Sequence, residues 1–155
     1  MSLNPRPLYF DQLRLDQSFD FGNWQLDRND MVAFAKHWDP QPFHIDDQQA
    51  ANSPFGGLTA SSLYLFAICT KLFSEYRPEF AVLAMLGKDE IRLPAAARPG
   101  DELNYLSRCI DLRRSRSKAD RGIVTLLDQL KNQHIEIILT QKVTLMLHAD
   151  PDHEA

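Results

Sequence analysis

Hydrophobic and polar positions divide the chain into a first half with helical spacing and a second half with strand-like runs. The longest helical candidate covers about residues 58–76, where apolar residues recur at intervals of three and four on nearly all sides. Such a helix is expected to be buried rather than to lie on the surface. Arg77-Pro78 is expected to end it, because proline cannot continue a helix.

Shorter elements surround this helix. Aromatic and aliphatic residues over 19–26 predict a strand. Asp27 suits the N-cap of a short helix, which must stop by Trp38-Asp39 because Pro40 disfavours helical dihedrals at the residue before it. Asp46 is expected to cap a further short turn. The remaining strands are predicted over 82–93, 103–112, 123–130 and 135–147.

The connections between the later strands indicate how they pair. Residues 98–101 suit a tight turn, because proline fixes one dihedral and glycine accepts a positive one. Residues 113–121 form a basic, polar connection, and residues 131–134 suit a hairpin turn. Strands linked by hairpins favour antiparallel pairing. The sequence therefore predicts an α+β fold, a single hotdog domain in which a curved antiparallel β-sheet is wrapped around a long central helix.

Length and composition limit the remaining classes. The 155 residues fit one domain over 1–155, with a core at about 15–148 and loosely held ends at 1–10 and 150–155. A net charge of -4 argues against a protein that coats nucleic acid or a membrane surface. The five histidines lack metal-ligand spacing, so no metal site is expected. The two cysteines are expected to be buried free thiols, and without a signal peptide or spanning segment the protein is expected to be cytoplasmic.

The candidate chemistry lies in one short segment. Asp39 and His44 stand five positions apart, with Pro40 and Pro42 between them. The prolines stiffen the loop, so it can hold a carboxylate and an imidazole ready for general acid–base catalysis. The alternative is a loop in which Asp39 only caps a turn and His44 only packs. The spacing by itself leaves both interpretations open.

This segment resembles the MaoC-like dehydratases, which include the (R)-specific enoyl-CoA hydratases. Asp39, Pro42, His44 and Asp46 match the family signature, and residues 55–60 (FGGLTA) match the loop that leads into the central helix. The resemblance continues to about residue 148, through residues 92–94, 98–101, 114–117, 120–122 and 132–133. Three positions depart from the pattern: Gln41 replaces the usual asparagine, and Ser61-Ser62 replace the usual His-Gly.

The resemblance implies a reaction and roles for named residues. Asp39 would activate a water for addition to an enoyl thioester, and His44 would hold the water and relay a proton. The backbone N–H of Ser62, at the start of the central helix, would stabilise the oxyanion on the thioester oxygen. Gly57, Ser62 and Thr70 are candidate substrate-binding residues. Arg114 and Arg116 would bind the phosphates of coenzyme A, or they belong to a solvated connection.

The expected function is the reversible hydration of trans-2-enoyl-CoA to (R)-3-hydroxyacyl-CoA. The alternatives are a non-catalytic acyl-CoA-binding hotdog module and a hotdog thioesterase. The expected substrate is an acyl-CoA or an acyl carrier thioester, with no further cofactor, no nucleic acid and no membrane partner. A homodimer or larger homo-oligomer is expected, because the unpaired edge of the sheet needs to be covered.

Overall fold

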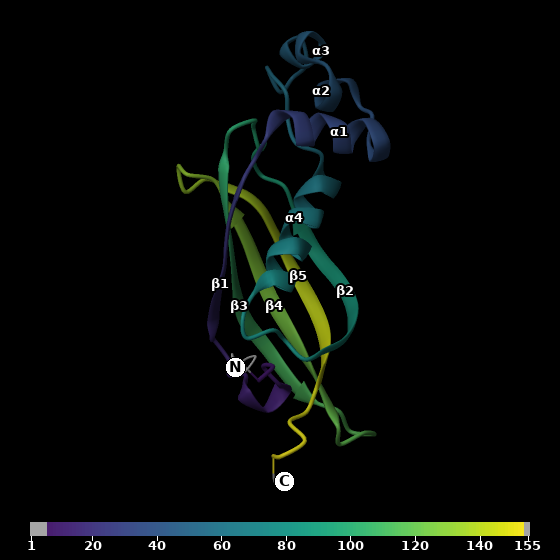
Figure 1. Cartoon of the computed structure of the whole chain (residues 1–155), viewed down its shortest axis with the longest axis vertical. Coiled ribbons are helices and arrows are strands. Elements are labelled where there is room, and N and C mark those ends of the chain that lie inside the picture. Colours follow the sequence, from purple (N-terminus) through teal and green to yellow (C-terminus); the bar gives the residue numbers. More distant parts are fainter. Residues whose placement is uncertain (1–5, 154–155) are drawn as a thin grey trace, which may run out of the picture.

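A five-stranded antiparallel sheet curves around one long helix in the computed structural model, which describes residues 6–153 (Figure 1). The elements are η1 (Phe10–Gln12), β1 (Ser18–Gln25), α1 (Arg28–Trp38), α2 (Pro42–Ile45), α3 (Asp47–Ala51), α4 (Ser62–Glu75), β2 (Val82–Arg92), β3 (Glu102–Arg114), β4 (Arg121–Lys131) and β5 (Ile137–His148). The strand order is β1-β3-β4-β5-β2. This is the predicted α+β hotdog architecture.

The core forms between α4 and the inner face of the sheet. Alternate residues of β4 are buried, and most of them are apolar, as a strand with one face on the core requires. α4 contributes the buried Leu65, Ile68, Cys69 and Leu72 to the same core. Both cysteines are buried free thiols, as predicted. Burial raises the pKa of the Cys69 thiol to about 12, so it is protonated at neutral pH.

The predicted start of the central helix is wrong by four residues. α4 begins at Ser62, and Ser61 is its N-cap, with φ -60° and ψ 141°. The backbone of the preceding segment bonds to distant parts of the chain instead: the Thr59 N–H donates to the Phe43 carbonyl in α2, and the Ala60 N–H donates to the Ala97 carbonyl. The helix is also not buried on all sides of this chain, because Leu63 is 45% exposed.

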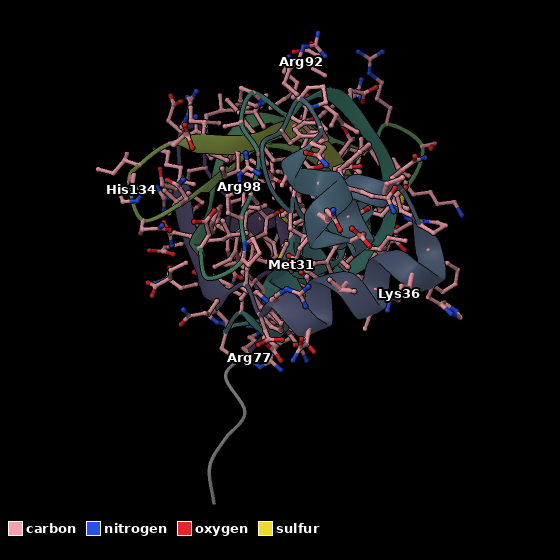
Figure 2. All side chains as sticks on the ribbon, turned by 90° about the horizontal axis from the view of Figure 1, so that it is seen from above. Met31, Lys36, Arg77, Arg92, Arg98 and His134 are labelled. Atoms are coloured by element: carbon pink, nitrogen blue, oxygen red, sulfur yellow. The ribbon has the colours of Figure 1, made fainter. Side chains whose placement is uncertain are left out.

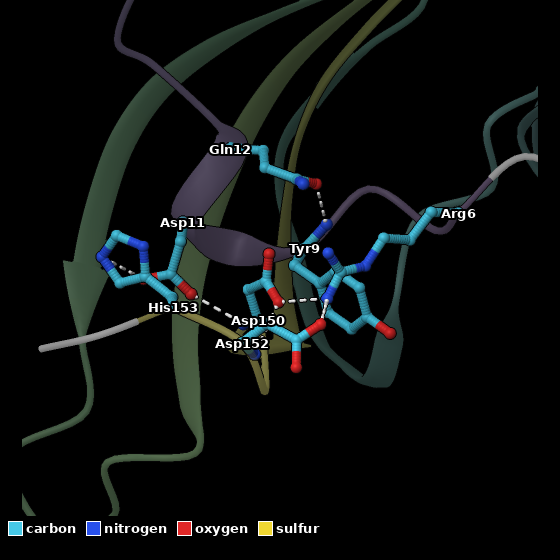
Figure 3. Close-up of polar contacts among 7 residues, drawn as sticks. All are labelled: Arg6, Tyr9, Asp11, Gln12, Asp150, Asp152 and His153. Carbon is cyan, nitrogen blue, oxygen red and sulfur yellow. Dashed lines mark hydrogen bonds and ion pairs between the residues drawn. The ribbon is translucent and has the colours of Figure 1, made fainter.

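The described parts of both chain ends are held in place, which corrects the prediction of loose ends. The Leu8 N–H donates to the Glu79 carbonyl at 2.7 Å, and Arg6 pairs with Asp150 and Asp152 at 2.6 Å each (Figure 3). The Asp150 N–H in turn donates to the carboxylate of Asp11 at 2.7 Å. The bonds to Asp150 and Asp152 join segments more than 130 residues apart. The prediction for residues 1–5 and 154–155 lies outside the described residues.

Candidate active site

The catalytic candidates sit at the junction between α1 and α2. Asp39 is the C-cap of α1, and its N–H donates to the Ala35 carbonyl at 2.8 Å. Pro42 occupies the first position of α2, where its missing N–H costs nothing. This single turn carries His44, and Asp46 caps α3 directly after it. The proline-bound segment therefore places two ionisable side chains beside the start of α4.

The carboxylate and the imidazole face each other. Nε2 of His44 lies 3.4 Å from Oδ2 of Asp39, and His44 is only 8% exposed. On the other side of the ring, Nδ1 lies 2.8 Å from the carbonyl oxygen of Thr59. A carbonyl only accepts hydrogen bonds, so Nδ1 must carry a proton. In the neutral ring Nε2 is then an acceptor, free to take a proton from a molecule between the two groups.

Ser61 makes a further contact to this pair that the sequence analysis missed. Its hydroxyl donates to Oδ2 of Asp39 at 2.7 Å and accepts the Leu63 N–H at 3.2 Å. The side chain is buried, with Ser61 1% exposed, so the bond is shielded from water. Ser61 therefore ties the Asp39 carboxylate to the first turn of α4. A serine directly before an apolar helical run is an N-cap signal, and that signal was available in the sequence.

The first backbone N–H of α4 is available as a hydrogen-bond donor. Ser62 is the first residue of the helix, and its N–H has no acceptor among residues 6–153. The residue lines a cavity of about 450 Å³ together with His44, Thr59, Leu65 and Leu93. Unpaired donors at a helix start, together with the helix dipole, favour negative charge. The cavity thus has His44 and an anion-stabilising donor on its wall, and Asp39 contacts the His44 ring without lining the cavity.

Gly57 and Thr70 lie near this cavity without lining it. The Gly57 carbonyl accepts a hydrogen bond from Nη1 of Arg98 at 2.8 Å, and Arg98 also donates to the Phe55 carbonyl. Seen from above, Arg98 lies well inside the outline of the molecule, whereas Arg92 lies at its periphery (Figure 2). Thr70 is eight residues along α4 from Ser62, about 12 Å at the rise of an α-helix. It lines a separate cavity.

Arg114 and Arg116 are not brought to the Asp39–His44 pair within one chain. They stand at the β3–β4 connection, at the end of the sheet remote from α1 and α2 (Figure 1). Arg114 pairs with Asp11, whose side chain is only 4% exposed, and lies over the Phe10 ring. This pairing neutralises a buried carboxylate that also holds the C-terminal segment. It gives Arg114 a structural role at the chain ends.

A second polar group, also missed in the sequence, lies under α4 on the inner face of the sheet. Asp128 is fully buried and accepts hydrogen bonds from the hydroxyls of Tyr105 at 2.7 Å and Ser107 at 2.8 Å. Gln141 donates to it at 2.9 Å, and Lys88 donates to the amide oxygen of Gln141 at 3.2 Å. Burial raises the pKa of the Asp128 carboxyl, and these hydrogen bonds oppose the shift.

Within residues 6–153, no group of three or more His, Cys, Asp or Glu side chains is placed to hold a metal ion. None of the helices described is long and apolar enough to span a membrane.

The fold and the site together define a hotdog protein with an Asp–His pair beside the start of its central helix. A family model described as "MaoC like domain" matches residues 11–129. The chain therefore belongs to the MaoC-like family, which confirms the resemblance seen in its sequence.

Individual relatives agree with this assignment. A MaoC-like dehydratase from Rhodospirillum rubrum is 31% identical, with a TM-score of 0.86 over 93% of this chain and 99% of that one. The (R)-hydratase of A. caviae involved in PHA biosynthesis is 21% identical, with a TM-score of 0.73 over 87% of this chain and 97% of that one. The uncharacterized protein YdeM of Bacillus subtilis (strain 168) is 28% identical over 79% of this chain and 86% of its own length. The family and its relatives support an enzyme of the hydratase or dehydratase kind.

Proposed function

We propose that this protein catalyses the reversible hydration of trans-2-enoyl-CoA to (R)-3-hydroxyacyl-CoA. The observation that carries the proposal is the pairing of Asp39 with a His44 whose tautomer is fixed, beside the free N–H of Ser62. The dehydratase and (R)-hydratase names of the structural relatives support the same reaction. The reaction adds water across a polarised double bond, for which a proton-transfer pair and an oxyanion donor suffice.

The geometry assigns a step to each group. A water held between Oδ1 or Oδ2 of Asp39 and Nε2 of His44 attacks C3 of the enoyl group. One proton of the water passes to the pair, and the electrons of the C2–C3 double bond shift toward the thioester carbonyl. The carbonyl oxygen becomes an oxyanion, which accepts a hydrogen bond from the Ser62 N–H. The pair then returns a proton to C2, so both residues end in their starting state. Asp39 and His44 exchange protons as one coupled unit.

An absorbance assay with crotonyl-CoA tests the proposal. Hydration removes the conjugated enoyl thioester, so absorbance should fall without release of free thiol. Release of free thiol would instead identify a hotdog thioesterase. Binding of the thioester with neither change would identify a non-catalytic acyl-CoA-binding module.

The hydroxyls of Ser61 and Ser62 are expected to differ in importance. Ser61→Ala removes the hydrogen bond to Asp39. The value of kcat should therefore fall about tenfold, the loss expected when one hydrogen bond to a charged group is removed. Ser62→Ala keeps the backbone N–H and should have a small effect. Steady-state kinetics on both variants checks this; a collapse in Ser62→Ala would assign the donor role to its hydroxyl.

We also propose that two chains pair through β2. This strand ends the sheet, and it exposes Val82, Leu83, Met85 and Leu86, with Met85 58% exposed. β1, at the other edge, exposes polar residues instead: Ser18, Asp20, Asn23 and Gln25. An exposed apolar edge strand offers both backbone hydrogen bonds and hydrophobic surface to a second copy.

A charge placed in this edge should break the dimer. The wild-type protein is expected to sediment as a particle of twice 17.8 kDa, and Leu86→Asp should shift it toward the monomer. Ile135→Asp serves as the control, because Ile135 is 76% exposed on the β4–β5 connection, away from β2. A wild-type protein that sediments as a monomer at all concentrations contradicts the proposed assembly.

A further inference from the structure

A second cavity follows the first along α4. It measures about 170 Å³, and its walls include Cys69, Thr70 and Phe73 of α4 and Met85 and Lys88 of β2. On α4, Leu65 lines the first cavity and Cys69 the second, and these residues are one helical turn apart. Met85 and Lys88, which line the second cavity, lie on β2. Leu93, which lines the first cavity, directly follows the end of β2 at Arg92. The two cavities therefore follow one another along α4, and we refer to them together as the groove.

Lys88 is the charged residue on the wall of this otherwise largely apolar cavity. It pairs in register with Val143, which is buried on the inner face of the sheet, so its side chain points toward α4. Its ammonium lies 5.2 Å from the centroid of the Phe66 ring. Its hydrogen-bond acceptor among the described residues is Gln141 Oε1, and an ammonium carries three donors. Donors therefore remain for a ligand in the groove.

Neutralisation of Asp128 does not by itself account for this placement. A lysine that serves only as a counter-ion would contact the carboxylate directly, whereas here the neutral amide of Gln141 stands between the two charges. Three hydrogen bonds, from Tyr105, Ser107 and Gln141, already satisfy Asp128. The amide nitrogen of Gln141 faces Asp128, so its oxygen faces Lys88 and holds the ammonium at the cavity wall.

We propose that the acyl group of the substrate carries a carboxylate at its far end, and that Lys88 binds this carboxylate. The inference rests on the proposed function for one point, the placement of the thioester beside Ser62 and His44 in the first cavity. From there the acyl chain extends along α4 into the second cavity. Apolar side chains contact its methylene groups, and the Lys88 ammonium forms a charged hydrogen bond with its end.

Matched substrates test this preference on the wild-type protein. Steady-state kinetics compares trans-2-hexenoyl-CoA with trans-2-hexenedioyl-CoA, which has the same number of carbons and ends in a carboxylate. The dicarboxylic substrate should have the higher kcat/KM, by about 10- to 100-fold for one charged hydrogen bond. Equal values, or a preference for the methyl-ended chain, would overturn the inference and leave the proposed hydration intact.

Variants and a binding measurement separate the two proposals. Lys88→Met should remove the preference for the dicarboxylic substrate, and Lys88→Arg should keep it. Lys142→Met is the control and should not change the preference, because Lys142 pairs with exposed Glu90. Calorimetry with the saturated thioesters hexanoyl-CoA and adipoyl-CoA gives the same comparison without catalysis. If neither enoyl thioester is hydrated, the proposed function fails, and the calorimetric comparison still decides the role of Lys88. Equal affinity of the wild-type protein for the two saturated thioesters would contradict the proposed role of Lys88.

Discussion

Asp39→Asn should lower kcat about 10²–10⁴-fold while leaving the fold intact, because the amide keeps the shape of the side chain but cannot take a proton. The variant retains an acceptor for the Ser61 hydroxyl, so the first turn of α4 stays in place. Steady-state kinetics measures the loss, and the thermal unfolding midpoint checks the fold. Asp111→Asn is the matched control, because this aspartate is exposed on β3. A fully active Asp39→Asn protein would refute the assignment of the base.

The same experiment extends to His44 through a double variant. His44→Ala should also cost about 10²–10⁴-fold, because it removes the imidazole whose Nε2 faces Asp39. Since the two groups act as one proton-transfer unit, the double variant should lose far less than the product of the single losses. Fully multiplicative losses would mean that the residues act in separate steps.

The second large effect is on stability. Asp128→Ala should lower the free energy of unfolding by about 3–5 kcal/mol, because it leaves three buried donors without their acceptor. Urea denaturation measures the change. Asp111→Ala, again on the exposed face of β3, should stay within about 0.5 kcal/mol of wild type. A loss below about 1 kcal/mol for Asp128→Ala would show that the network contributes little.

The direction of the Asp128 pKa shift adds a pH dependence. Burial raises this pKa above its ordinary value of 3.8, and Lys88 opposes the shift. The folded state therefore binds a proton more tightly than the unfolded chain between 3.8 and the raised pKa. The stability that Asp128 contributes should fall as pH rises through this window and stay constant above it. The difference in unfolding free energy between wild type and Asp128→Asn should show this fall, and a rise would contradict it.

Local patterns in the sequence were sufficient to predict most of the fold. Alternation and turn residues located the antiparallel strands, and Pro40 located the end of α1. The start of α4 was misplaced because Leu58 and Ala60 continue the apolar spacing, although their segment is held by bonds to α2 and to the loop at Ala97. The ordered chain ends were missed for a similar reason. The pairs of Arg6 with Asp150 and Asp152 join residues that no local pattern relates.

The candidate site was predictable to a similar extent. The signature around Asp39 and His44 indicated the pair that the structure brings together. The bond from Ser61 was missed because it depends on how α4 meets the end of α1, which is a tertiary contact. Arg114 fitted a phosphate site by charge alone, but its partner Asp11 is about a hundred residues away in the chain. The phosphate-binding role of Arg114 and Arg116 stays a prediction.

Hydration in oxygen-18 water tests the central claim most directly. Purified wild-type protein is incubated with crotonyl-CoA in labelled water, and the products are separated and analysed by mass spectrometry. The account predicts 3-hydroxybutyryl-CoA with its thioester intact and the label in its hydroxyl group, and almost none of it from Asp39→Asn. Label in a free carboxylate, or recovery of unlabelled crotonyl-CoA alone, would contradict the account.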